Sequence, residues 1–222
     1  MKLVLFDIQN TLVRDPIDVS QYITETIRNV YGLYTEVSLH EYLGRSIQEI
    51  LEDVLTKNGI GKEDIDSKLD LLPNDLYYSY YNVAGHEEQE TASGAQQLLA
   101  ELSKGGALLG IASSEPERIA KFRLERSNLS SYFKVAAYGN EARSMKERAK
   151  LAIERARQQH NVDKVFFVAN SLPQVEAAAE LGVVSIAVSN GGNAALLRNA
   201  GAKEVVDSLH EKGKIANLIL KD

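Results

Sequence analysis

The chain has 222 residues, a formal net charge of −6 and no cysteine. Its acidic balance gives no broad basic surface, so nucleic acid and anionic membranes are not expected partners. Without cysteine, the chain has no disulfide, thiolate nucleophile or Cys-based zinc site. No apolar run reaches the roughly 18 residues of a membrane span, and the first residues resemble a core strand instead of a signal peptide, so we expect a cytoplasmic protein.

The first predicted element is a strand that ends at Asp7. Residues 3–6 form an unbroken apolar run, without the alternation of a half-exposed strand. Such a run is typical of a parallel strand buried on both faces, and ligands usually bind beyond the carboxyl ends of such strands. The sequence therefore places Asp7 where chemistry is expected, although a single Asp at a strand end more often has only a structural role.

A different pattern follows Arg14, because apolar residues recur at helical spacing between residues 19 and 82. The recurring positions are Tyr22, Ile23, Ile27, Val30, Ile47, Ile50, Leu51, Val54, Leu55, Leu69, Leu72, Leu76 and Tyr80. Glycines and a Leu-Pro-Asn turn separate the segments. We therefore predict a helical domain over residues 15–87, inserted into a core domain formed by residues 1–14 and 88–222.

From residue 107 onward, predicted strands alternate with predicted helices. The strands cover residues 107–112, 133–137, 165–168 and 183–188, and the helices cover 116–127, 146–160, 172–181 and 194–199. This order implies parallel strand pairing with helices on both faces of the sheet. We predict an α/β fold with a doubly wound, Rossmann-like parallel sheet.

Polar residues follow the successive strands and should converge at one edge of the sheet. In chain order they are Asp7, Ser113-Ser114, Gly139-Asn140 and Asn170. A serine after a strand is common, so the order of the whole set is more informative than any single position.

These positions resemble the motifs of the haloacid dehalogenase (HAD) superfamily, over essentially the whole chain. Residues 7–12, Asp-Ile-Gln-Asn-Thr-Leu, are similar to the motif Asp-x-Asp-Gly-Thr-Leu, in which the first Asp is the nucleophile and the second is the general acid/base. Asp7 matches the nucleophile, whereas Gln9 replaces the acid/base. In the second motif, the resemblance implies that Ser113, Ser114 and neighbouring N–H groups hold phosphoryl oxygens.

The third HAD motif supplies a cation, because developing negative charge requires a preset positive group. Our best register places Met145 at that position, with Arg143 and Lys146 beside it. A shift of one residue would restore Lys146, so both basic residues are candidate phosphate ligands. A lysine in the first turn of an amphipathic helix is, however, most often only solvated.

The fourth motif, Gly-Asp-x-x-x-Asp, resembles residues 169–174, with Asn170 and Gln174 replacing the two acids. The resemblance implies that Mg²⁺ would be held by Asp7, the backbone carbonyl of Gln9 and Asn170. Since Mg²⁺ prefers carboxylate oxygens, we expect a weak or empty site. Gln9 cannot transfer a proton, a contribution worth about 10²–10⁴ in rate, so the three amides together predict a poor phosphatase or none.

The helical insertion resembles a C1-type HAD cap. Residues 43–46, Leu-Gly-Arg-Ser, and the apolar positions after them are similar to the phosphoglycolate-phosphatase-like group. In that group, the cap covers a small phosphorylated substrate.

Three functions remain open. The favoured one is a HAD-fold protein with little or no catalysis that binds phosphate or a small phosphorylated metabolite. The second is an active Mg²⁺-dependent phosphatase or related hydrolase that uses Asp7, with missing groups supplied by nearby residues. These candidates are Arg14, Asp15, His40 and His86. The third is an interaction protein that uses the tyrosines of residues 77–81, although such a cluster is more often internal packing. A homodimer is compatible with each function.

Overall fold

The computed structural model describes residues 1–14, 19–38, 42, 45–69, 71–84 and 89–221. Its sheet has six parallel strands in the order β3-β2-β1-β4-β5-β6. The strands are β1 (Lys2–Phe6), β2 (Leu108–Ala112), β3 (Val135–Ala137), β4 (Lys164–Ala169), β5 (Val184–Val188) and β6 (Glu204–Val206). The predicted doubly wound α/β fold is confirmed, and the four strands expected after residue 107 end within two residues of their predicted limits.

The strand order reverses between β1 and β4. The chain passes from β1 to β2 and β3 on one side, and then returns to place β4 on the other side of β1. Phe6 pairs with Ile111 of β2 and with Val168 of β4. Asp7, the next residue, therefore lies at the point of reversal, where open α/β sheets form their ligand-binding crevice.

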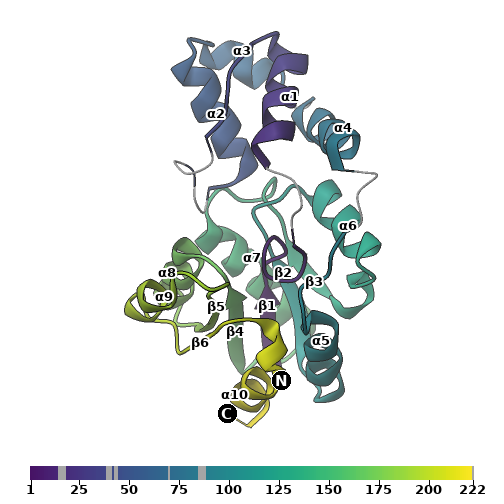
Figure 1. Ribbon diagram of the computed structural model, residues 1–222, viewed down its shortest axis with the longest axis vertical. Helices are drawn as coiled ribbons and strands as arrows, with labels where there is room; N and C mark the ends of the chain where they lie inside the picture. The colour runs from purple at the N-terminus through teal and green to yellow at the C-terminus, as the bar shows by residue number, and fades with distance from the viewer. Residues whose placement is uncertain (15–18, 39–41, 43–44, 70, 85–88, 222) are drawn as a thin grey trace.

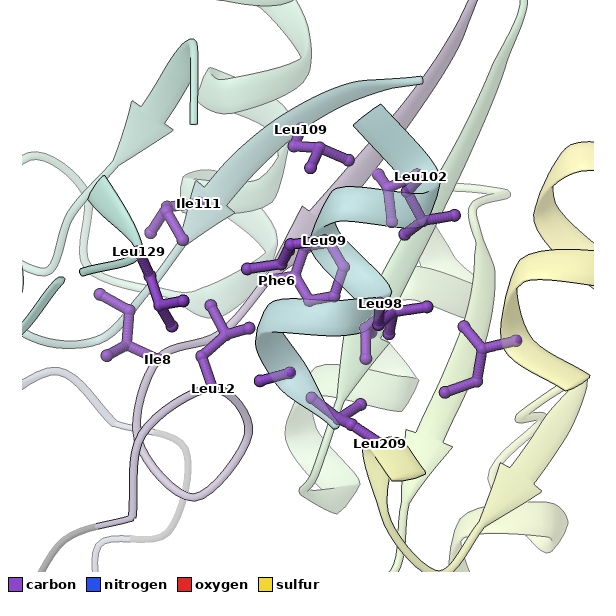
Figure 2. Close-up of a cluster of buried hydrophobic side chains, with 14 of the residues drawn as sticks. Phe6, Ile8, Leu12, Leu98, Leu99, Leu102, Leu109, Ile111, Leu129 and Leu209 are labelled. Atoms are coloured by element: carbon purple, nitrogen blue, oxygen red, sulfur yellow. The ribbon is translucent and has the colours of Figure 1, made fainter. Parts of the chain in front are cut away.

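Alternate residues of β1 enter two separate hydrophobic layers, because successive side chains of a strand point to opposite faces. Val4 and Phe6 pack with α5 (Ala95–Lys104) and α10 (Lys212–Lys221). Leu3 and Leu5 pack with α7 (Met145–Gln159) and α8 (Leu172–Glu180). Figure 2 shows the first layer, in which Phe6 lies beneath the leucines of α5. Each fully buried side chain contributes about 1.5–3 kcal/mol.

The remaining core helices are α6 (Glu117–Arg126) and α9 (Ala194–Asn199), with 3₁₀ turns at Ser130–Tyr132 and Leu209–Glu211. Lys2 Nζ donates to the carbonyl of Leu220 at 2.9 Å, so the first strand and the last helix are tied together. Both termini lie at the end of the molecule opposite the inserted helices (Figure 1). Among the described residues, none of the helices has both the length and the apolar character that a bilayer crossing requires.

Four helices lie between β1 and β2 in the described part of the insertion. They are α1 (Val19–Tyr31), α2 (Ile47–Lys57), α3 (Lys62–Ser67) and α4 (Leu72–Ala84). They share a hydrophobic cluster that also includes Ile119 of α6, and they lie beyond the carboxyl ends of the strands (Figure 1). The predicted boundaries at residue 15 and residues 87–88 fall outside the described residues.

Helix α4 packs against α6 of the core through aromatic rings. The ring of Phe122 lies 5.9 Å from those of Tyr77 and Tyr81 and 6.1 Å from that of Tyr80, measured between centroids. Arg118 covers the ring of Tyr77 at 3.9 Å. Most of the tyrosine cluster of residues 77–81 therefore forms an internal contact between the insertion and the core.

Candidate functional site

Asp7 is almost completely buried at the end of β1, with 4% of its surface exposed. Its Oδ2 accepts a hydrogen bond from Gln174 Nε2 at 2.6 Å. Its Oδ1 is also buried and has no hydrogen-bond partner among the described residues. The following loop turns back on itself, since Asn10 adopts φ 55° and the amides of Leu12 and Val13 both donate to the carbonyl of Ile8.

Burial raises the pKa of the Asp7 carboxyl, because a carboxylate loses solvation in the protein interior. The nearby Ile8 N–H, the Gln174 amide, the Ser113 hydroxyl and the Arg148 charge act in the opposite direction. The site therefore holds a carboxyl group whose ionisation depends on a few specific neighbours.

Gln174 connects the start of α8 to Asp7. Its Oε1 accepts from the backbone N–H groups of Asn170, at 2.8 Å, and Ser171, at 3.2 Å, and completes the capping box of α8. Because a backbone N–H can only donate, this oxygen assignment leaves Nε2 facing Asp7 as a donor. Gln174, at the second acid position of the fourth motif, therefore caps α8 and also donates a hydrogen bond to the buried Asp7 carboxyl.

Asn170 makes the corresponding contact to the first motif. Its Nδ2 donates to the backbone carbonyl of Gln9 at 2.6 Å. A carbonyl oxygen has no proton to give, so the amide nitrogen must be the atom that faces it. Two amide N–H groups are therefore aimed at two oxygens that the HAD resemblance assigns to Mg²⁺.

This arrangement does not fit Mg²⁺. Each ligand of the ion must present an oxygen lone pair at about 2.0–2.1 Å. Here the carbonyl of Gln9 and Oδ2 of Asp7 already accept N–H donors, so Asp7 has only its buried Oδ1 left to offer, and Asn170 presents its nitrogen where an oxygen would be needed. Within the described residues, there is no group of three or more His, Asp or Glu side chains that could hold a metal ion.

The loop after β2 is held tightly in place. Ser113 is completely buried; its N–H donates to the carbonyl of Ala137 at 3.1 Å, and its hydroxyl accepts from the N–H of Glu115 at 3.3 Å. Gly139 approaches so closely that a Cβ there would collide with the carbonyl of Ser114. Ser114 remains half-buried and faces the cavity beside Asp7.

A cavity of about 210 Å³ lies between the core and the insertion. Its core residues include Asp7, Gln9, Ser114, Met145, Asn170 and Gln174, and its residues from the insertion include Tyr42, Arg45, Ile47 and Ile50. The structure thus brings together residues of the first, second and fourth predicted motifs. It also identifies lining residues of the insertion that no motif had indicated.

The two basic candidates of the third motif pair with other residues. Arg143 Nη2 lies 2.9 Å from a carboxylate oxygen of Glu52 on α2, so it joins the core to the insertion. Lys146 Nζ lies 2.8 Å from Glu180 on α8 and is half-exposed. Met145, the position in our best register, lines the cavity itself.

Arg148 is the basic residue that sequence reasoning missed. It is completely buried on α7, and its charge and that of Asp7 act on each other. Its Nη1 donates to the backbone carbonyls of Ala142 and Arg143. The sequence spacing could have indicated it, because Arg148 lies three residues after Met145 on the buried face of α7. An arginine on an apolar stripe is rarely buried without a specific role.

Of the proposed substitutes for a missing catalytic group, Arg14 is exposed and pairs with Glu90 at 3.2 Å. Asp15, His40 and His86 lie outside the described residues, as do Leu43 and Gly44 of the motif that resembles the phosphoglycolate-phosphatase group.

Residues 4–188 match a family model described as haloacid dehalogenase-like hydrolase. The chain belongs to this family. It is 21% identical over 196 residues to a phosphoglycolate phosphatase of Vibrio vulnificus, covering 87% of this chain and 86% of that protein. This HAD-like protein is therefore phosphatase-like and resembles phosphoglycolate phosphatases.

Solved structures show the same fold. The structure of CbbY from Rhodobacter sphaeroides in complex with phosphate has a TM-score of 0.73 and 18% identity, over 95% of this chain and 96% of that chain. A predicted phosphoglycolate phosphatase from Haemophilus somnus has a TM-score of 0.72 and 16% identity, over 96% of both chains. These likenesses extend over both the sheet and the inserted helices of this HAD-like protein.

Proposed function

We propose that this HAD-like protein has little or no phosphatase activity and retains a site for a small oxyanion beside Asp7. The observation that carries the proposal is the pair of amide contacts, Gln174 to Asp7 and Asn170 to the carbonyl of Gln9. Both contacts place N–H donors where a metal-dependent phosphatase of this family needs oxygen ligands.

General acid/base catalysis would be impaired independently of metal binding. Gln9 lies at the general acid/base position and lines the cavity, but a neutral amide does not exchange protons at useful rates. Asp7 could still attack a phosphoryl group, yet neither protonation of the leaving group nor activation of water has an evident donor or base at Gln9. The two losses together predict very slow turnover.

Binding of an oxyanion depends on groups that are retained. The loop of Ser113 and Ser114 and the charge of Arg148 remain beside Asp7. The resemblance to phosphoglycolate phosphatases and the likeness to a phosphate complex support phosphate or a small phosphorylated metabolite as the ligand. Mg²⁺ would then be at most a weak cofactor.

A panel of phosphomonoesters tested with Mg²⁺ measures the activity directly. We expect turnover below that of a phosphoglycolate phosphatase assayed in parallel by at least about 10²-fold, from the missing acid/base alone. Ordinary turnover that disappears in Asp7→Asn would contradict the proposal and support the active phosphatase.

A further inference from the structure

We propose that a second cavity, adjoining the one beside Asp7, binds a compact uncharged apolar group about the size of a single benzene ring. Two sources supply such a group: a substituent on the oxyanion of the proposed function, and a separate neutral molecule. The cavity exists whether or not an oxyanion binds, so this site goes beyond the proposed function.

The cavity has a volume of about 200 Å³ and lies between the insertion and the core. We call it the leucine cavity. Its lining residues are Gln48 and Leu51 of α2, Leu69, and Leu72, Pro73 and Leu76 of α4, facing Ser114, Pro116, Gly139 and Asn140 of the core. Most of these side chains are aliphatic, and none of these described residues carries a charge.

The walls of the leucine cavity are held by packing. Leu51, Leu72 and Leu76 are almost fully buried, and Leu69 is half-buried. An engineered protein cavity of about 150 Å³ with walls of this kind binds benzene. The leucine cavity is larger than that, so a single ring fits within its volume.

The cavity beside Asp7 has the opposite character. Three charged residues line it, namely Asp7, Arg45 and Glu115. In the leucine cavity, by contrast, a charged group would lose solvation without meeting an opposite charge among the described lining residues. The leucine cavity therefore favours hydrocarbon over a charged group.

The two cavities adjoin each other at Ser114 and along α2. Ser114 lines both. Helix α2 contributes Ile47 and Ile50 to the cavity beside Asp7, and it contributes Gln48 and Leu51 to the leucine cavity. An apolar group in the leucine cavity would thus lie next to the site proposed for the oxyanion.

The polar residues of the leucine cavity do not oppose an apolar ligand. Gln48 Nε2 donates to Oε1 of Glu52 at 3.1 Å, and Asn140 Oδ1 accepts from the N–H of Glu117 at 2.8 Å. Gln48 and Ser114 are half-buried and Asn140 is exposed, so their remaining polar atoms lie on residues that solvent reaches. A ring therefore avoids the cost of a stranded, fully buried polar group.

The first test adds benzene to the full chain, isotope-labelled in its leucine methyl groups, and follows these groups by NMR. We expect the signals of Leu51, Leu72 and Leu76 to shift and saturate. The signals of Leu98 and Leu99, in the hydrophobic layer beneath α5, should stay unchanged.

The second test compares phenylphosphonate with methylphosphonate, by calorimetry in a chelator and by the same methyl signals. If the ring belongs to the oxyanion, phenylphosphonate should bind at least about 10-fold more tightly, the effect of burying one ring. If the ring belongs to a separate molecule, benzene should shift the three leucines while both phosphonates bind equally. Failure of both benzene and phenylphosphonate to shift Leu51, Leu72 and Leu76 overturns the inference.

Leu69→Asp places a carboxylate in the half-buried wall. It should weaken whichever ring probe binds by at least about 10-fold, because the ring would remove water from the new charge. The matched control is Leu71→Asp, at a side chain that is 54% exposed and does not line the leucine cavity, and it should bind as the wild type does. Unchanged ring binding in Leu69→Asp overturns the inference. The probe titrations need only the wild type, so they decide the matter even where this variant fails to fold.

The outcomes separate the leucine cavity from the proposed function. If neither phosphonate binds, the oxyanion site is contradicted, and benzene still tests the leucine cavity. If methylphosphonate binds and no ring probe reaches the three leucines, only the leucine cavity is contradicted.

Discussion

At the scale of single residues, Asp7 shares its cavity with three neutral amides, Gln9, Asn170 and Gln174, at positions where its family has acids. Gln174 and Asn170 do more than remove charge, because each donates to an oxygen that a metal ion would need. Gln174 is also held in place by the backbone N–H groups of Asn170 and Ser171. Replacing only one of these two amides by an acid therefore removes one N–H donor and leaves the other in place.

Combining Gln9→Asp with Asn170→Asp should restore an acid/base and a carboxylate ligand. We expect Mg²⁺ affinity and phosphatase rate to rise together, and each single variant to gain much less, because residues that act as one unit are non-additive. Calorimetry with Mg²⁺ and a phosphomonoester assay measure the two effects. Asp7→Asn added to the double variant is the control, and it should abolish the gain. A well-folded double variant without any gain would show that Gln174 or Met145 also blocks the site.

A second prediction concerns the buried ion pair of Glu115 and Arg123, in which Glu115 directly follows the Ser113–Ser114 loop. Both side chains are almost fully inaccessible to solvent. Arg123→Met leaves the Glu115 carboxylate buried without its partner and should lower the free energy of unfolding by about 3–5 kcal/mol. Urea unfolding measures the loss. Adding Glu115→Gln should recover much of it; a double variant as unstable as the single would refute the charge-based explanation.

At the scale of elements, Glu141 joins β3, the following turn and α7. One of its oxygens accepts from the N–H of Tyr138 at 2.9 Å, and the other lies 2.6 Å from Arg155 Nη2. Arg155 Nη1 also donates to the carbonyl of Ala136 in β3 at 2.6 Å. The hydrogen bond from Arg155 is the main reason that the pKa of Glu141 lies below its ordinary 4.5.

Glu141→Gln should therefore destabilise the protein at neutral pH by about 1 kcal/mol, a value reduced because Arg155 is partly exposed to solvent. A lowered pKa means that the carboxylate stabilises the folded state above the unfolded-state pKa, and that this stabilisation is lost as pH falls through the folded-state pKa. The difference between wild type and variant should begin to shrink as pH falls below the ordinary 4.5 and should disappear only below the lowered folded-state pKa. Thermal unfolding of wild type and variant, followed from neutral to acidic pH, measures this difference in stability. The control is Glu154→Gln, at an exposed ion pair on α7. A difference that persists at low pH would contradict the argument.

At the scale of the whole molecule, an aromatic contact and an ion pair are among the contacts that join the insertion to the core. One is the packing of Phe122 against the tyrosines of α4, and the other is the ion pair of Arg143 with Glu52. Arg143 is largely exposed, and such pairs contribute about 0–1 kcal/mol. The aromatic contact should therefore dominate.

Phe122→Ala should loosen the insertion without unfolding the sheet. Phe122 is only half-buried, so we expect a loss of about 1–3 kcal/mol, below the 3–5 kcal/mol of a fully buried ring. Limited proteolysis should cut the helices α1–α4 faster, while fragments of residues 89–221 persist. Tyr34→Ala, at a tyrosine that is 77% exposed, should leave the cleavage pattern unchanged. Simultaneous loss of both regions would show that they unfold as one unit.

The sequence by itself determined the fold and half of the site. Unbroken apolar runs indicated buried parallel strands, helical spacing indicated the insertion, and the residue after each strand was placed at one edge of the sheet. Asp7, Ser113 and Asn170 could be chosen in this way because each follows directly from a local pattern in a known topology.

Only the tertiary structure decided what these residues contact. Gln174 and Asp7 are separated by 167 positions, and Asn170 and Gln9 by 161, so no local pattern encodes which atom donates to which. Local sequence likewise did not identify the basic residue that acts on Asp7. Arg143 and Lys146 were the nearest candidates in sequence, but their partners come from α2 and α8, while Arg148 is turned inward by the position of α7 on the sheet. The local sequence determines which helix, strand or loop carries a side chain. The packing of elements that are distant in sequence determines which charged group that side chain contacts.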